Sequence, residues 1–399
     1  MKNKAIQLPY IFTFPSTAFL LCLLICTKNT AQTNLAFDQL TIKDGLPSQA
    51  ITEMIQDDLG FIWIANENGL TRYDGYAFKT YSYEPFASNK SLSEGHTQSL
   101  AIDKSGNILV GTVGGGLNVF NPATEILEHF LHDNNNSNSI SNDFVSDIAV
   151  DPKGGIWLAT NNGLNYLSKD YKFFQHYLTN QNPFGADHLV KCVYADPKGN
   201  ILAGAESGAI FIIKPGHNSI EIGERFFQND RNPISCIVPA KTGGVWIGTQ
   251  GGGIYLLDKN YNLIRRINTS SRPYISDNEV YSILEDNKGN IWVGLRNSLD
   301  VIDLNTQQTA HYLNGKDQSG IAVNVIINII QDRSGVIWVC SDGQGLYLAR
   351  KKRFGGGIHT GQLVRDLYKD EDNSIWVACG GSGLLHIPNC CDEKISNVS

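Results

Sequence analysis

The sequence predicts an all-β protein: a seven-bladed β-propeller of four-stranded blades, followed by an eighth repeat that starts a second, truncated propeller. One pattern returns eight times: a turn that is Asp-x-x-Gly in six copies, an apolar run containing Trp or Leu, a small residue, and, in most copies, Gly-Leu a few positions later. The copies recur at roughly 45 residues, the length of one propeller blade. The Trp or Leu positions are Trp63, Leu109, Trp157, Leu202, Trp246, Trp292, Trp338 and Trp376.

Each part of the repeat has a physical role in a blade. Asp-x-x-Gly predicts a hairpin turn, because the Asp side chain can bond nearby backbone amides and the Gly accepts a positive φ. The runs that follow, such as 62–64 and 245–247, are β-branched and aromatic, and predict strands buried on both faces. The Trp column is therefore expected to be core. Two residues further on, a small residue predicts close approach of neighbouring blades. These residues are Ala65, Gly111, Ala159, Gly204, Gly248, Gly294, Cys340 and Ala378.

Another column predicts the lining of the central channel. A small or polar residue stands seven positions before the turn Gly, and the residue after it is apolar. This pattern is expected if one side of the innermost strand faces a wet channel and the other side packs between sheets. The column contains Glu53, Ser99, Asp147, Cys192, Cys236, Ser282, Asn328 and Asp366.

The repeats divide the chain into five predicted parts. Lys2, Lys4 and the apolar stretch before Ala31 predict a signal peptide over residues 1–31, with a retained membrane anchor as the alternative. Residues 36–348 form the seven-bladed propeller, in which the strand near Phe37 completes the last blade and closes the ring. We expect a junction at 349–361, the first blade of an incomplete second propeller at 362–388, and an irregular tail at 389–399. An eight-bladed ring is the alternative count.

Composition excludes one class of partner and favours no cofactor. The net charge of −7 and the pI near 5.7 argue against a nucleic-acid surface. No cysteine pair has the spacing of a metal site, so we expect no metal and no cofactor. Cys192 and Cys236 occupy the same column of adjacent repeats. A disulfide between them is conceivable in an oxidising compartment, although inner strands of adjacent blades are normally too far apart for one.

No residue pattern predicts catalysis, so we expect no catalytic residue. The turn resembles the Asp-box of sialidases, but those enzymes also need several arginines converging on a carboxylate, whereas the arginines here fall on unrelated repeat positions. A sialidase-like or lyase-like propeller enzyme is thus the less favoured alternative.

The loops on one face of the propeller are the predicted ligand-binding surface. In propellers, the loops before the innermost strands and those joining the second and third strands share a face, and such loops commonly carry binding function. Their polar side chains suit sugar hydroxyls, and Arg296 would suit a carboxylate or sulfate. The candidate residues are Arg296, Asn297, Glu67, Asn161, Glu206, Gln250 and Asp342.

The residues at 37–48, 55–65 and 69–75 resemble the two-component regulator propeller repeat of Bacteroidetes hybrid two-component sensors, and the likeness continues through all eight copies. The resemblance implies a periplasmic sensor with two seven-bladed propellers, a β-sandwich, a membrane span, a histidine kinase, a receiver and a DNA-binding domain. It implies an oligosaccharide released from a glycan as the ligand, and the remaining sensor domains as partners. A homodimer is a further possibility.

The sequence departs from that pattern after the eighth copy, where it shows no second apolar span, kinase motif or helix-turn-helix. We expect an N-terminal fragment, a truncated gene product or a stand-alone relative. The alternative function is a secreted propeller that acts alone as a protein-interaction or carbohydrate-binding module.

Overall fold

The computed structural model describes residues 35–85, 90–179, 187–214, 220–222, 232–313, 321–322, 324–351, 364–370, 374–379, 383–387 and 396–398. The predicted signal peptide and residues 352–361 of the predicted junction lie outside these residues.

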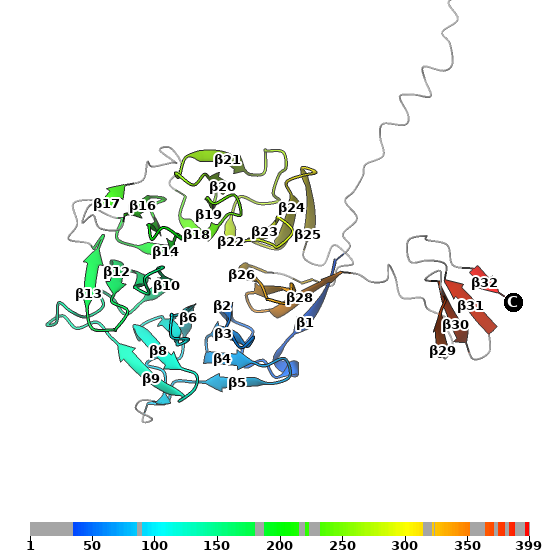
Figure 1. Cartoon of the computed structure of the whole chain (residues 1–399), viewed down its shortest axis with the longest axis horizontal. Helices are drawn as coiled ribbons and strands as arrows, with labels where there is room; N and C mark the ends of the chain where they lie inside the picture. The colour runs from blue at the N-terminus through cyan, green and yellow to red at the C-terminus, as the bar shows by residue number, and fades with distance from the viewer. Residues whose placement is uncertain are drawn as a thin grey trace, which may run out of the picture. The chain divides into compact units, whose positions relative to one another are not determined.

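Seven four-stranded antiparallel sheets surround a common axis as the blades of a propeller (Figure 1). Each innermost strand packs against that of the next blade, and the seventh packs against the first, which closes the ring. The seven-bladed fold is confirmed, and the eight-bladed alternative is wrong. Blades 1 to 3 contain β2 (Ile51–Gln56), β3 (Ile62–Asn66), β4 (Gly69–Tyr73), β5 (Phe78–Tyr81), β6 (Thr97–Ile102), β7 (Ile108–Thr112), β8 (Leu117–Asn121), β9 (Ile126–Phe130), β10 (Val145–Val150), β11 (Ile156–Thr160), β12 (Gly163–Leu167) and β13 (Phe174–Tyr177). Blades 4 to 6 contain β14 (Val190–Ala195), β15 (Ile201–Ala205), β16 (Ile210–Ile213), β17 (Ile220–Ile222), β18 (Ile234–Pro239), β19 (Val245–Thr249), β20 (Gly253–Leu257), β21 (Leu263–Ile267), β22 (Val280–Glu285), β23 (Asn290–Leu295), β24 (Ser298–Asp303) and β25 (Gln308–Leu313).

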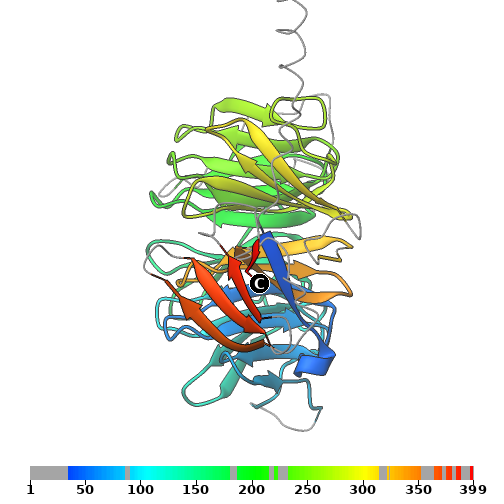
Figure 2. The same cartoon turned by 90° about the vertical axis from the view of Figure 1, so that its right-hand side faces the viewer.

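The first strand of the chain completes the seventh blade. This blade contains β26 (Ile326–Gln331), β27 (Ile337–Ser341) and β28 (Gly345–Lys351), and β1 (Leu35–Leu40) pairs antiparallel with β28 as its outermost strand (Figures 1 and 2). The predicted closure is therefore correct. Residues 349–351, expected in the junction, belong to β28. A short 3-10 helix, η1 (Ile42–Asp44), follows β1 and is capped by Thr41.

An eighth sheet has the strand order of a blade. It consists of β29 (Val364–Lys369), β30 (Ile375–Cys379), β31 (Gly383–Ile387) and β32 (Ser396–Val398). Residues 389–399 are expected from the sequence to be an irregular tail. Part of this segment instead forms β32, because its backbone pairs with β31.

The Trp column is core, as predicted. The five tryptophans of the propeller are buried, and Trp376 of the eighth sheet is partly buried. In four blades the indole N–H donates to the carboxylate of the Asp that opens the same blade's turn, as Trp63 does to Asp57 at 2.7 Å. That Asp also accepts backbone N–H groups of the turn, so one carboxylate joins the turn to the core.

The small column lies where adjacent blades meet. A Cβ added at Gly204 of blade 4 would lie 2.5 Å from Cγ2 of Ile234, in the first strand of blade 5. Real Cβ atoms do not approach other atoms so closely, so the small residue is required for the observed packing. Within the described part of the chain, no helix has the length and apolarity needed to cross a membrane.

Candidate functional site: a polar cavity on the propeller axis

A β-bulge at the same place in every innermost strand sets the direction of the channel side chains. In β2 the pairing with β3 shifts between Ile51 and Glu53, so Thr52 is the extra residue, and the same shift occurs in all seven blades. A bulge breaks the two-residue alternation of a strand and re-aims the side chains beside it. The bulge residues are Thr52, Gln98, Ser146, Lys191, Ser235, Tyr281 and Ile327, and all of them line one cavity.

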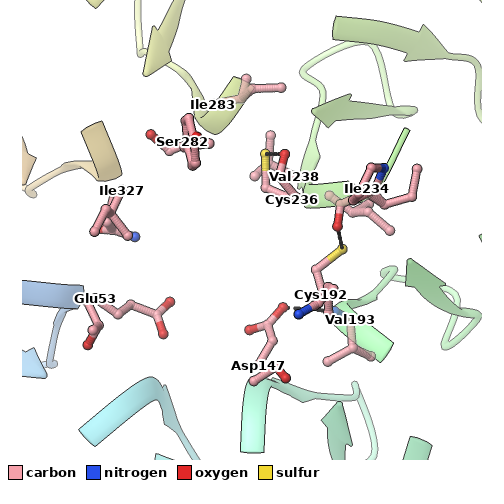
Figure 3. Close-up of a pocket in the computed structure, with 18 of the residues that line it drawn as sticks. Glu53, Asp147, Cys192, Val193, Ile234, Cys236, Val238, Ser282, Ile283 and Ile327 are labelled. Carbon is pink, nitrogen blue, oxygen red and sulfur yellow. Dashed lines mark hydrogen bonds between the residues drawn. The ribbon is translucent and has the colours of Figure 1, made fainter. Parts of the chain in front are cut away.

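This cavity has a volume of about 520 Å³ and receives side chains from the innermost strands of all seven blades (Figure 3). Six of the seven channel-column residues predicted for the propeller line it, Ser99 being the exception. In six of the seven blades, therefore, the bulge residue and the channel-column residue after it both face the cavity, whereas the sequence pattern predicts only the channel-column residue. The bulge residues were missed because a bulge is an offset in pairing, and no single residue type marks it.

The two serines of the channel column bond the next blade through its backbone carbonyl. Ser282 donates to the carbonyl of Ile326 at 3.0 Å, and Ser99 donates to that of Val145 at 3.3 Å. The cross-strand partner of each serine or cysteine in this column is a glycine, since the Oγ of Ser282 occupies the space of a Cβ at Gly294, only 2.2 Å away. The four such pairs are Ser99 with Gly111, Cys192 with Gly204, Cys236 with Gly248, and Ser282 with Gly294.

The two channel carboxyls bond the next blade through its backbone N–H instead. Oε2 of Glu53 accepts from the N–H of Leu100 at 2.7 Å, and Oδ2 of Asp147 accepts from the N–H of Val193 at 2.8 Å. Oδ1 of Asp147 also accepts from the N–H of Ile148. Each carboxyl thus joins its own blade to the following one at the channel wall.

Enclosure in the channel makes both carboxyls weak acids. Burial raises the pKa of Glu53 well above its ordinary value, and the nearby charge of Asp147 raises it further. Burial raises the pKa of Asp147 to about 7, against the opposing effect of the backbone N–H groups of Val193 and Ile148. Because a neutral carboxylic acid can donate a hydrogen bond, the pair offers both donor and acceptor atoms near neutral pH.

Cys192 of β14 and Cys236 of β18 are free thiols that line the same cavity, so no disulfide joins them, and Figure 3 shows Cys192 beside Asp147. Burial is the main cause that raises the pKa of both, well above the ordinary value for Cys192 and to about 12 for Cys236. Both sulfurs are therefore protonated and weakly nucleophilic at neutral pH. Within the described residues, no group of three or more His, Cys, Asp or Glu side chains is placed to hold a metal ion.

Two of the seven predicted loop residues border the cavity. These are Glu206 and Gln250, and Lys191 pairs with Glu206 at 2.9 Å. Arg296 is beside the cavity but its guanidinium is already engaged, donating to Glu279 at 2.7 Å and to the hydroxyl of Tyr281 at 2.6 Å. Of these, Tyr281 reaches the cavity lining.

The other four predicted residues occupy the expected loops without lining the cavity. The backbone N–H groups of Glu67, Asn161, Asn297 and Asp342 each bond a carbonyl one or two residues before an innermost strand. This arrangement places both kinds of loop on one face. Glu67 accepts a hydrogen bond from Ser48 at 2.8 Å, and Asn297 has a positive φ of 62°, a conformation that asparagine tolerates.

Fold and cavity together define a class: a closed seven-bladed β-propeller with a polar cavity on its axis. The model of the two-component regulator propeller matches residues 139–162 and 274–297, each of which includes an innermost strand, the Asp turn and the Trp strand. Two of the chain's repeats, in blades 3 and 6, therefore match the two-component regulator propeller repeat.

Two of the similar proteins are described as signalling proteins, the second of them similar in fold alone. Histidine kinase P4 of Formosa agariphila is 27% identical over 85 residues, which are 21% of this chain and 6% of that protein. The extracellular domain of a protein described as a hybrid two-component system of B. thetaiotaomicron has 22% identity and a TM-score of 0.69, over 91% of this chain and 49% of that one. The chain thus spans about half the length of that solved domain.

A propeller enzyme shares the same fold. Virginiamycin B lyase from Staphylococcus aureus, solved as a catalytically inactive variant with quinupristin, has 13% identity and a TM-score of 0.62, over 79% of this chain and 99% of the lyase. At this identity, the likeness concerns the fold alone.

Proposed function

We propose that this propeller is the ligand-binding part of a hybrid two-component sensor, exported to the periplasm, and that its axial cavity binds an oligosaccharide derived from a glycan. The observation that carries the proposal is the cavity of about 520 Å³, to which every blade contributes a side chain. A kinase and a DNA-binding domain would supply the output, from protein outside this propeller.

The lining suits a ligand rich in hydroxyl groups. Thr52, Ser146 and Ser235 contribute hydroxyls, and Gln98 and Gln250 contribute amides, each able to donate and accept hydrogen bonds. The repeat family and the likeness to a histidine kinase support a sensory role. A stand-alone propeller that binds proteins or carbohydrates is the alternative, and a homodimer stays a prediction.

We infer that the eighth sheet is the first blade of a second propeller. Asp366 pairs with Ala378 across the strands and accepts the N–H of Leu367, just as Asp147 pairs with Ala159 and accepts the N–H of Ile148. β29 also carries the same bulge, between Val364 and Asp366. In the closed propeller, Asp147 goes on to bond the next blade, and Asp366 has the local geometry for that bond.

Binding, rather than turnover, is the activity that we propose. The channel thiols are protonated, and the loop arginine is held by Glu279 and Tyr281, so neither supplies an activated nucleophile or a free anion clamp. The test is a screen of purified chain against neutral, acidic and amino oligosaccharides by titration calorimetry. Chromatography of the recovered sugars distinguishes binding from cleavage.

A binding hit is then placed by mutation. Gln250→Ala and Ser235→Ala should each weaken a cavity ligand about threefold to tenfold, because each removes one hydrogen bond. Glu128→Gln, on the exposed side of the outermost strand β9, is the matched control and should bind normally. Unchanged affinity in both cavity variants would move the site away from the axis.

A further inference from the structure

We propose that the axial cavity selects oligosaccharides carrying an ammonium group, as in amino sugars, over those carrying a carboxylate or sulfate, and that Glu53 and Asp147 determine this preference. This inference rests on the proposed function, because it names the chemical class of ligand for the same site.

The charges that line the cavity are predominantly acidic. Four charged side chains border it, namely Glu53, Asp147, Lys191 and Glu206. The ammonium of Lys191 lies 2.9 Å from a carboxylate oxygen of Glu206, so these two charges offset each other. Glu53 and Asp147 remain without a basic side chain in hydrogen-bond contact among the described residues.

Arg296 does not alter this balance. Its guanidinium donates to the carboxylate of Glu279 and to Tyr281, and that carboxylate neutralises it. An anionic ligand at the loop face would therefore meet a guanidinium whose charge Glu279 already offsets. The sequence had suggested Arg296 as a receptor for a carboxylate or sulfate, and the contacts of its side chain argue against that role.

The two carboxyls have free capacity for a donor. Only Oε2 of Glu53 bonds the protein, to the N–H of Leu100, and Oε1 has no hydrogen-bond partner among the described residues. Figure 3 shows both carboxyl groups pointing into the open space between the blades, from β2 and from β10. Each oxygen of Asp147 accepts one backbone N–H, which leaves a lone pair on each for a ligand.

An ammonium group is the ligand group that best offsets the cost of enclosing these carboxyls. An enclosed carboxylate is unfavourable unless an opposite charge or a proton compensates it, and the raised pKa values of both groups favour a proton in the absence of a ligand. The remaining titratable groups on the cavity wall are the thiols Cys192 and Cys236 and the phenol Tyr281, which are neutral near pH 7. A bound ammonium would replace the proton, whereas a carboxylate or sulfate would add a like charge.

The experiment compares three matched sets of short oligosaccharides, built from glucosamine, N-acetylglucosamine and glucuronic acid, by titration calorimetry against the purified chain. We expect the glucosamine set to bind at least about tenfold more tightly than the other two, the size of one charge-assisted hydrogen bond. The affinity should fall as the pH is lowered from about 7 to 5, because protonation of the two carboxyls removes the attraction. Repeating the titration in buffers of different ionisation enthalpy should show that binding releases protons.

The variant Glu53→Gln with Asp147→Asn tests the residues. Gln and Asn keep a carbonyl oxygen for the N–H groups of Leu100 and Val193, so circular dichroism should report a folded propeller. Its preference for glucosamine oligosaccharides should disappear, while Glu128→Gln keeps it. Neutral or acidic sugars that bind as well as the amino sugars would overturn the inference and leave the proposed function intact. If no oligosaccharide of any charge binds, the proposed function is wrong and this inference is wrong with it.

Discussion

Tyr261 donates a 2.5 Å hydrogen bond to Asp196 across the boundary between blades 5 and 4. Asp196 opens the turn of blade 4, where the repeat has Leu202 instead of Trp. In blade 6, by contrast, Trp292 donates its indole N–H to Asp286 at 3.0 Å from within the same blade. A tyrosine from the next blade therefore takes the place of the missing indole donor.

Blade 2 repeats this exchange. It has Leu109 in the Trp column, and Tyr171 of blade 3 donates to its turn residue Asp103. Both tyrosines have a positive φ, 67° for Tyr261 and 60° for Tyr171, so the backbone adopts an uncommon conformation where each hydroxyl is delivered. The two Trp-to-Leu changes are thus compensated in three dimensions, which links adjacent blades.

Removing the hydroxyl of Tyr261 should destabilise the propeller. Tyr261→Phe deletes a donor to a charged carboxylate, and we expect the free energy of unfolding to fall by about 1–2 kcal/mol. Burial and the bond to Asp196 raise the pKa of Tyr261, so the hydroxyl donates throughout the usual pH range. Urea denaturation monitored by tryptophan fluorescence measures the change. Tyr76→Phe, at a residue that is 96% exposed, is the control, and an equal effect in both variants would contradict the role of the interblade bond.

In blade 5 the donor is kept and the acceptor in the turn is missing. It retains Trp246 but has Ala240 where other blades have Asp, and the indole N–H donates to Glu285 of blade 6 at 2.9 Å. The turn at Ala240 keeps the backbone hydrogen bonds of the Asp turns. A carboxylate at residue 240 would therefore fit the geometry used elsewhere.

A pair of substitutions tests this exchange. Glu285→Gln should lower the melting temperature by a few degrees, because the buried indole N–H loses a charged acceptor. Adding Ala240→Asp to that variant should recover the loss by restoring the arrangement of blades 1, 3, 6 and 7. Ala240→Asp alone should not stabilise, since it places two carboxylates at one donor. Differential scanning calorimetry of the four proteins gives the answer, and additive effects would show that the two positions are independent.

The close contact at Gly294 gives a third prediction. A Cβ there would lie 2.2 Å from Oγ of Ser282 and 2.7 Å from the backbone oxygen of Ile326 in blade 7. Gly294→Ala should cost about 1–3 kcal/mol of unfolding free energy, because a backbone atom of the next blade has to move. Gly95→Ala is the control, as its nearest neighbours are 3.8 Å away. Equal stability of the two variants in urea would show that the blades can separate freely at this position.

The periodic features of this protein were predictable because each is encoded by residue type at a fixed interval. The spacing of the tryptophans predicted the blades, and the early strand containing Phe37 predicted the closure, which its burial against Tyr312 bears out. The small and polar columns predicted the blade contacts and most of the channel wall. Local propensity and pattern act in the same direction at these positions.

The features that the sequence did not reveal depend on geometry between strands or between blades. Lys191 and Tyr281 reach the cavity because of a bulge, and a bulge has no residue signature. The hydrogen bond from Arg296 to Glu279 joins two loops, and no column of the repeat indicates how close these loops lie. One signal was available: each Leu in the Trp column is followed about 60 residues later by a tyrosine, as a donor from the next blade requires.

The folded protein should be more stable when Asp147 is protonated than when it is ionised, and the pH dependence of stability should reveal this. Its pKa in the folded protein is raised from an ordinary value of 3.8 to about 7, chiefly by burial. A carboxyl whose pKa is higher in the folded than in the unfolded protein contributes its full stabilisation at a pH below the unfolded-state pKa. That contribution is lost as the pH rises through the folded-state pKa. Asp147→Asn is neutral at every pH and should lack this loss. Between about pH 5 and pH 8 the melting temperature of the native chain should therefore fall relative to that of Asp147→Asn, whereas Glu128→Gln should follow the native curve. Parallel curves for all three proteins would mean that Asp147 is ionised without cost, and that the channel is more strongly hydrated than its packing implies.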